Sequence, residues 1–134
     1  MTSRDSALLA LRPSVQADPD AAASDVEAFL HRTLRPVLKL QNPVLLQLVA
    51  RDVARRVPDF SRFAVDDQRE RLATRLRTDS RLKQGLVGVV YGAFTEAELA
   101  FALDHLAEIR RRTLALLTER VLSHVETVSE LAES

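Results

Sequence analysis

Apolar residues recur at helical spacing along most of this chain, and no segment alternates polar and apolar residues as a half-buried strand would. Several apolar runs begin at recognisable helix starts, where a side-chain oxygen can accept a hydrogen bond from a free amide of the first turn. These starts are Ser24 with Glu27, Asn42 with Pro43, Asp66, and Thr95 with Glu98. The pattern therefore predicts an all-α fold.

The length and the helix starts predict a single compact bundle of about five helices. A chain of 134 residues fits one domain, which we place at residues 24–134. Residues 1–23 contain two prolines and no sustained apolar run, so we expect a flexible N-terminal tail. Pro36 is expected to break or kink the first helix, because proline lacks the amide hydrogen.

The last predicted helix is long. No proline or glycine interrupts the chain after Thr95, so the helix is expected to run to about Val128, which is about 50 Å at 1.5 Å per residue. Because the preceding helices are shorter, part of its apolar surface would lack cover. We therefore predict a homodimer whose interface is formed by Phe101, Leu114, Leu117, Val121, Val125 and Val128. The alternative is that two shorter helices stack end to end along it within a monomer.

All three glycines of the chain fall in one apolar stretch, at positions 85, 88 and 92. Their GxxGxxxG spacing matches neither of the glycine-rich phosphate loops. On a helix, Gly85, Gly88 and Gly92 lie within roughly 60° of one another, which predicts close packing of a central helix against a neighbouring backbone. The alternative is a strand over residues 85–92, because VGVVY has high β propensity.

The residues that usually carry catalysis or bind metal form no motif in this sequence. Cysteine is absent, and His31, His105 and His124 stand outside the zinc and di-metal patterns. His105 and Glu108 form one contact at i, i+3 spacing on a face that we expect to be solvated. His124 lies on the apolar stripe of the last predicted helix, near Val121, Val125 and Val128, so we expect it to be hydrogen-bonded in a core or an interface. We predict no catalytic residue, no cofactor and no metal site.

Arginine offers the main sign of a binding surface, although the 19 basic residues balance 19 acidic ones. Two basic stretches favour a solvated face with intrahelical ion pairs. The alternative is a surface that contacts an anion or a nucleic acid through Arg69, Arg71, Arg75, Arg77, Arg81, Arg110, Arg111 and Arg112. Arg110 falls on the apolar stripe of the last helix, so we expect a carboxylate partner, either Asp52 or Glu27.

These observations predict a non-catalytic protein-interaction or scaffold module that self-associates. One alternative is a nucleic-acid-associated regulatory protein that uses its arginine-rich surfaces, and another is a small-molecule-binding or enzymatic helical bundle. No apolar run approaches the length of a membrane span, and the run at Ala7–Leu11 is too short for a signal peptide, so we expect a cytoplasmic protein with no membrane partner.

Overall fold

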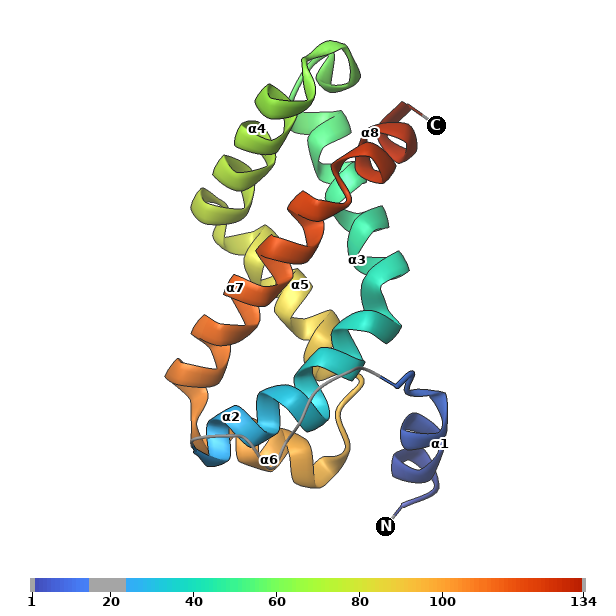
Figure 1. The fold of residues 1–134 in the computed structure, drawn as a ribbon, viewed down its shortest axis with the longest axis vertical. Helices are drawn as coiled ribbons and strands as arrows, with labels where there is room; N and C mark the ends of the chain where they lie inside the picture. Colours follow the sequence, from blue (N-terminus) through green and yellow to red (C-terminus); the bar gives the residue numbers. More distant parts are fainter. Residues whose placement is uncertain (1, 15–23, 134) are drawn as a thin grey trace.

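The computed structural model describes residues 2–14 and 24–133, and within these ranges the protein is all-α with no strand (Figure 1). Its α-helices are α1 (Ser3–Leu11), α2 (Asp25–Phe29), α3 (Arg35–Arg56), α4 (Val65–Thr78), α5 (Ser80–Tyr91), α6 (Glu96–Asp104), α7 (Leu106–Ser123) and α8 (Val125–Glu133). The all-α prediction is confirmed, and residues 85–91 are helical rather than a strand. The predicted number of about five helices is too low, because the N-terminal and C-terminal segments form more helices than expected.

The core lies where α3 packs against α5, α7 and α8, and α4 covers α7 from another side (Figure 1). Its side chains are almost fully buried: Leu34, Val37, Leu45, Val49, Val53, Leu72, Leu86, Phe94, Ile109, Leu117, Val121, Val125 and Val128. Removing this much apolar surface from water is the dominant favourable contribution to folding. None of the described helices is both long and apolar enough to cross a membrane.

The helix α3 begins at Arg35, one residue before Pro36, and runs through Pro43. A π-helical turn (Leu30–Leu34) joins α2 to α3 directly before Pro36, and Pro43 lies inside α3. A π-helical turn changes the local hydrogen-bond pattern, which accommodates a residue that has no amide hydrogen. The Pro43 ring is exposed, and buried residues before and after it hold the helix together. The predicted helix start at Asn42 is therefore wrong. Near Pro36 the chain is not broken but changes from π-helical to α-helical hydrogen bonding, with Pro36 in the first turn of α3.

The predicted long C-terminal helix is divided into α6, α7 and α8 by two histidines. His105 (φ −122°, ψ 41°) ends α6 and His124 (φ −112°, ψ 30°) ends α7, and neither backbone conformation is helical. In both cases the ring Nδ1 lies within hydrogen-bond distance of the carbonyl oxygen four residues earlier, at 3.1 Å from Phe101 and 2.8 Å from Arg120. The His124 amide donates to the Val121 carbonyl, so its ring donates to the Arg120 carbonyl that this leaves without an amide donor. The Phe101 carbonyl accepts from the His105 amide as well as lying near the His105 ring.

These breaks fold the predicted dimer interface into the core of one chain. Leu117 and Val128 are 0 % exposed, and Val121 and Val125 are 1 % exposed. Leu114 is half-buried, and Phe101, which was expected to face solvent, stacks on Phe29 with the ring centroids 4.9 Å apart. The predicted interface is therefore wrong, because α7 and α8, which carry the stripe, pack it against α3 within the same chain.

Residues 2–14 contain the docked helix α1 (Ser3–Leu11), so the prediction of a flexible tail is wrong for this part. Residues 15–23 lie outside the described residues. Thr2 caps α1 by accepting from the Asp5 amide. Arg4 donates to the carbonyls of Gly92 and Phe94 at 2.8 and 3.0 Å, and Arg12 forms a bidentate ion pair with Glu98. These contacts fix α1 at the turn between α5 and α6 (Figure 1).

Candidate functional site

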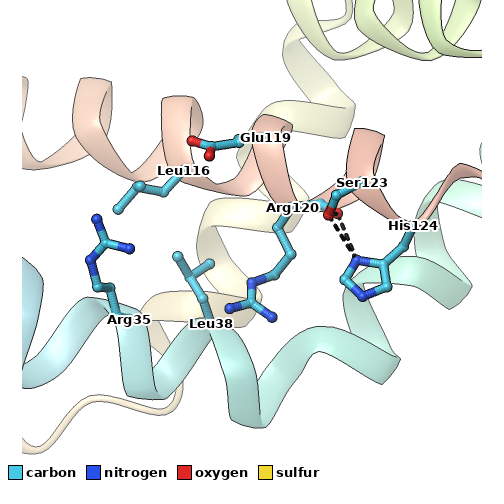
Figure 2. Close-up of a pocket in the computed structure, with 7 residues that line it drawn as sticks. All are labelled: Arg35, Leu38, Leu116, Glu119, Arg120, Ser123 and His124. Atoms are coloured by element: carbon cyan, nitrogen blue, oxygen red, sulfur yellow. Dashed lines mark hydrogen bonds between the residues drawn. The ribbon is translucent and has the colours of Figure 1, made fainter. Parts of the chain in front are cut away.

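An open pocket lies between the first turns of α3 and the last turns of α7 (Figure 2). On each helix the lining residues are three or four positions apart, so they share one face. The helix α3 contributes Arg35 and Leu38, and α7 contributes the rest, with His124 just after its end: Leu116, Glu119, Arg120, Ser123 and His124. The buried Leu38 and the half-buried Leu116 form the apolar part of the lining.

Arg35 and Arg120 bring two like charges to this pocket from facing helices. Figure 2 shows their side chains extending toward the opposite helix on either side of Leu38. Neither guanidinium forms an ion pair or a hydrogen bond within residues 2–14 and 24–133. Partial burial lowers the pKa of Arg120, and the positive charge of Arg35 lowers that pKa further. The fold therefore holds these two cations near each other at an electrostatic cost.

Glu119 is the acidic residue of the lining. Its carboxylate is exposed and pairs with neither arginine in the described part of the chain, and in Figure 2 it extends from α7 away from the Arg120 guanidinium. The lining thus carries two positive charges and one negative charge. Its electrostatic character is positive on the side where the two guanidinium groups face each other.

The hydrogen bonds of His124 determine which ring nitrogen carries the proton. Nδ1 lies 2.8 Å from the Arg120 carbonyl oxygen, which can only accept, so Nδ1 is the donor. The Ser123 hydroxyl donates to the same carbonyl at 2.7 Å and lies 3.2 Å from Nδ1. A protonated Nδ1 cannot take a proton from Ser123, so this pair is not arranged as a serine–histidine catalytic dyad.

The arrangement can bind an oxyanion. Guanidinium groups present parallel N–H donors that match the oxygens of phosphate and carboxylate groups, and here two of them approach from opposite walls. The pocket has a volume of about 250 Å³, which suits an inorganic anion or a small organic acid better than a nucleotide. Among the described residues, no group of three or more acidic or histidine side chains is placed to hold a metal ion.

The arginines predicted from sequence do not gather in this pocket. Four of them are engaged within the fold: Arg69 pairs with Asp66, Arg71 lies 3.8 Å above the Phe63 ring, Arg75 binds Asp52 and Asp79, and Arg112 pairs with Glu27. The hydrogen bonds that Arg75 donates to Asp52 are the main reason that the pKa of Arg75 is raised. The other four, Arg77, Arg81, Arg110 and Arg111, form no ion pair within the described ranges.

Arg110 lacks the partner that was predicted for it. Asp52 holds Arg75 in a bidentate pair with both distances at 2.9 Å, and Glu27 pairs with Arg112. Arg110 is half-buried beside Tyr91, and its charge acts to lower the pKa of that phenol against the larger, opposite effect of burial. The prediction of a carboxylate partner is wrong, because the two acids lie closer to other arginines.

The glycines also occupy a different environment from the one predicted. Gly85, Gly88 and Gly92 are exposed, and a Cβ added at Gly85 or Gly88 would meet no atom within 4 Å. The opposite face of α5 enters the core through Leu86 and Val90. Within this chain, the prediction of close backbone packing at the glycines is therefore wrong.

Sequence reasoning missed Arg35 and Arg120 as a pair. They are 85 positions apart, and each is surrounded by ordinary helical sequence. Only His124 was singled out, as a hydrogen-bonded histidine, and the structure confirms that hydrogen bonding. One sequence signal could have pointed to Arg120: it lies four residues after Leu116, on the same helical face, and directly precedes the buried Val121. A charged side chain at the edge of an apolar face is a candidate for binding.

Comparisons of this chain with protein-family models, with curated proteins and with solved structures found no match.

Proposed function

We propose that this protein is a non-catalytic binding module that captures a small oxyanion between α3 and α7. The observation that carries the proposal is the approach of Arg35 and Arg120 from facing helices without a paired carboxylate. Two unpaired cations held together raise the energy of the empty pocket, and a bound anion relieves this repulsion. The free energy gained when an anion binds is therefore larger here than at an isolated surface arginine.

A phosphate group fits the geometry better than a single carboxylate. Its tetrahedral oxygens can engage guanidinium groups from two walls at once, and it carries close to two negative charges at neutral pH. A planar carboxylate pairs best with one arginine in a bidentate manner. The expected ligand is therefore a phosphate ion or the phosphate group of a small metabolite.

Calorimetric titration with inorganic phosphate at constant ionic strength tests this proposal. The wild-type protein should bind with a Kd of about 1 mM or tighter, and Arg35→Gln and Arg120→Gln should each lose about 1.5–3 kcal/mol, which is roughly tenfold or more. Arg51→Gln on α3 and Arg111→Gln on α7 are matched controls, because both side chains are exposed and outside the pocket. Binding that the control variants reduce as much as the pocket variants contradicts the proposal.

A substitution of Glu119 should change phosphate affinity in the opposite direction to the arginine variants. Because its carboxylate belongs to the lining, Glu119→Gln removes a negative charge that opposes an incoming anion. We expect phosphate affinity to rise by a few-fold, corresponding to about 0.5–1 kcal/mol for an exposed charge. The same calorimetric titration measures it, and a loss of affinity would show that Glu119 supports the ligand or the pocket in another way.

Self-association is a second candidate function, at a surface other than the predicted stripe. Leu103 and Leu106 are 54 % and 52 % exposed on the two sides of the His105 break. Apolar side chains grouped at one corner favour a second copy of the chain as partner. Light scattering coupled to size exclusion should then give a dimer mass that Leu103→Glu with Leu106→Glu converts to a monomer; a monomer mass for the wild type at tens of micromolar rejects this candidate.

A further inference from the structure

A second pocket lies where the end of α4 and the start of α5 meet α7 (Figure 1). Its α7 residues, Leu114, Ala115 and Thr118, occupy a different face of the helix from Leu116 and Arg120. The remaining lining residues come from the other two helices: Ala73, Leu76, Arg77 and Lys83. The pocket has a volume of about 330 Å³ and is separate from the α3–α7 site.

The lining divides into an apolar floor and a cationic rim. Leu76 is buried, Leu114 is half-buried, and Ala73 and Ala115 add methyl groups beside them. The rim holds Arg77 and Lys83, and Thr118 supplies the third polar side chain of the lining. An apolar floor stabilises a hydrocarbon group by removing it from water, whereas the rim favours negative charge.

The turn between α4 and α5 positions the Lys83 ammonium beside the last turn of α4, from which Arg77 extends. The Lys83 ammonium donates to the Arg77 carbonyl oxygen at 3.0 Å, which ties the start of α5 to the last turn of α4. No carboxylate lines the pocket among the described residues. The acid nearest along the chain, Asp79, already binds Arg75 and accepts from the Leu82 amide. Both positive charges are therefore available to a ligand.

We infer that this pocket binds a small amphipathic anion, namely an organic carboxylate with an aliphatic tail. The tail lies on Leu76 and Leu114, and the carboxylate reaches the Arg77 guanidinium and the Lys83 ammonium. The inference does not depend on phosphate binding at the α3–α7 site, since the two pockets share no residue.

Titration with octanoate, compared with 1-octanol as the uncharged ligand of the same chain length, tests the inference. Calorimetry gives the affinities, and methyl proton–carbon NMR spectra show which leucines contact the ligand. We expect octanoate to shift the Leu76 and Leu114 methyl signals and to bind at least about tenfold more tightly than 1-octanol, because hydrogen bonds to charged groups are strong. The double variant Arg77→Gln with Lys83→Gln should remove this preference.

Two further variants keep the test informative. Arg81→Gln, an exposed arginine of α5 outside the lining, should leave octanoate affinity unchanged. Ala115→Phe keeps both cations but fills the floor, so it should abolish binding while circular dichroism confirms the fold. Equal affinity for octanoate and 1-octanol overturns the inference, and so does octanoate binding that shifts Leu38 and Leu116 in place of Leu76 and Leu114.

Discussion

Glu98 is the side chain through which the N-terminal helix is held to the bundle. Its two oxygens accept from both terminal nitrogens of Arg12, from the Thr33 hydroxyl and from the Thr95 amide. Burial raises the pKa of Glu98, but the hydrogen bonds from Arg12 and from the Thr95 amide outweigh this effect and hold the pKa below its ordinary value of 4.5. The ionised form is therefore stabilised by folding.

This depressed pKa predicts a pH-dependent contribution to stability. Because the folded pKa lies below 4.5, the contribution is complete above pH 4.5 and is lost as the pH falls through the folded value. Glu98→Gln should lower the free energy of unfolding at neutral pH by about 1–3 kcal/mol, and this difference should shrink on acidification.

Urea denaturation of both proteins at neutral and acidic pH measures the effect. Glu96→Gln is the control, because Glu96 lies in the same first turn of α6 but has an exposed side chain. A difference between wild type and Glu98→Gln that stays constant with pH would contradict the role assigned to the ionised carboxylate.

At the scale of helices, the structure separates features that local sequence determines from those that packing determines. The capping box of Thr95 and Glu98 was predicted, and both of its hydrogen bonds are present. The Ser24 cap is also present, but the Glu27 carboxylate binds Arg112 from α7. Caps follow from residues three positions apart, whereas the pairing of Glu27 depends on where a distant helix lies.

The ends of α6 and α7 could not be predicted because no proline or glycine marks them. His105 and His124 end these helices in non-helical backbone conformations, and each ring nitrogen lies within hydrogen-bond distance of the carbonyl four residues earlier. A histidine in an uninterrupted helical sequence gives no sign of this, because tertiary packing adds to local preference in setting where a helix ends. Likewise, the prolines of α3 were misread because tertiary packing outweighs their local cost.

The exposed glycines of α5 give a prediction at the same scale. An added methyl group at Gly88 meets nothing within 4 Å, and alanine favours a helix over glycine by about 0.5–1 kcal/mol. Gly88→Ala should therefore raise the free energy of unfolding by about that amount. Gly92→Ala should bring no such gain, because its Cβ would lie 3.1 Å from the Gly88 carbonyl oxygen.

Thermal and urea denaturation of the two glycine variants compare these effects directly. A loss of stability in Gly88→Ala would contradict this prediction. It would indicate that another chain packs against Gly88 in solution, where the added methyl group would then clash.

For the molecule as a whole, the central finding is that one chain covers its own apolar stripe. The sequence predicted that the apolar residues of the last segment are helical, which the structure confirms, and it favoured burial by a second subunit over burial within the chain. That choice depends on the turns at His105 and His124, which set the direction of α7 and α8. The pocket proposed to bind an anion depends on the same turns, because they set the direction of the helix from which Arg120 faces Arg35.

Because the chain buries its own apolar stripe, charged substitutions on the stripe should destabilise the fold. Leu117→Glu with Val121→Glu would place two carboxylates among core residues, at a cost of several kcal/mol, comparable to the total stability of a small domain. The double variant should therefore unfold, with loss of helical circular dichroism. A folded, monomeric double variant would instead indicate that these residues form an interface between subunits.

The claim that Arg35 and Arg120 form an anion site is tested most directly by observing their side chains. In nitrogen-labelled protein, the arginine Nε–Hε signals can be recorded during a phosphate titration at fixed ionic strength and assigned with Arg→Gln variants. We predict that the Arg35 and Arg120 signals shift together along one saturating curve, while those of Arg51 and Arg111 stay in place. Unchanged Arg35 and Arg120 signals, or equal shifts at all four arginines, would contradict a specific site between α3 and α7.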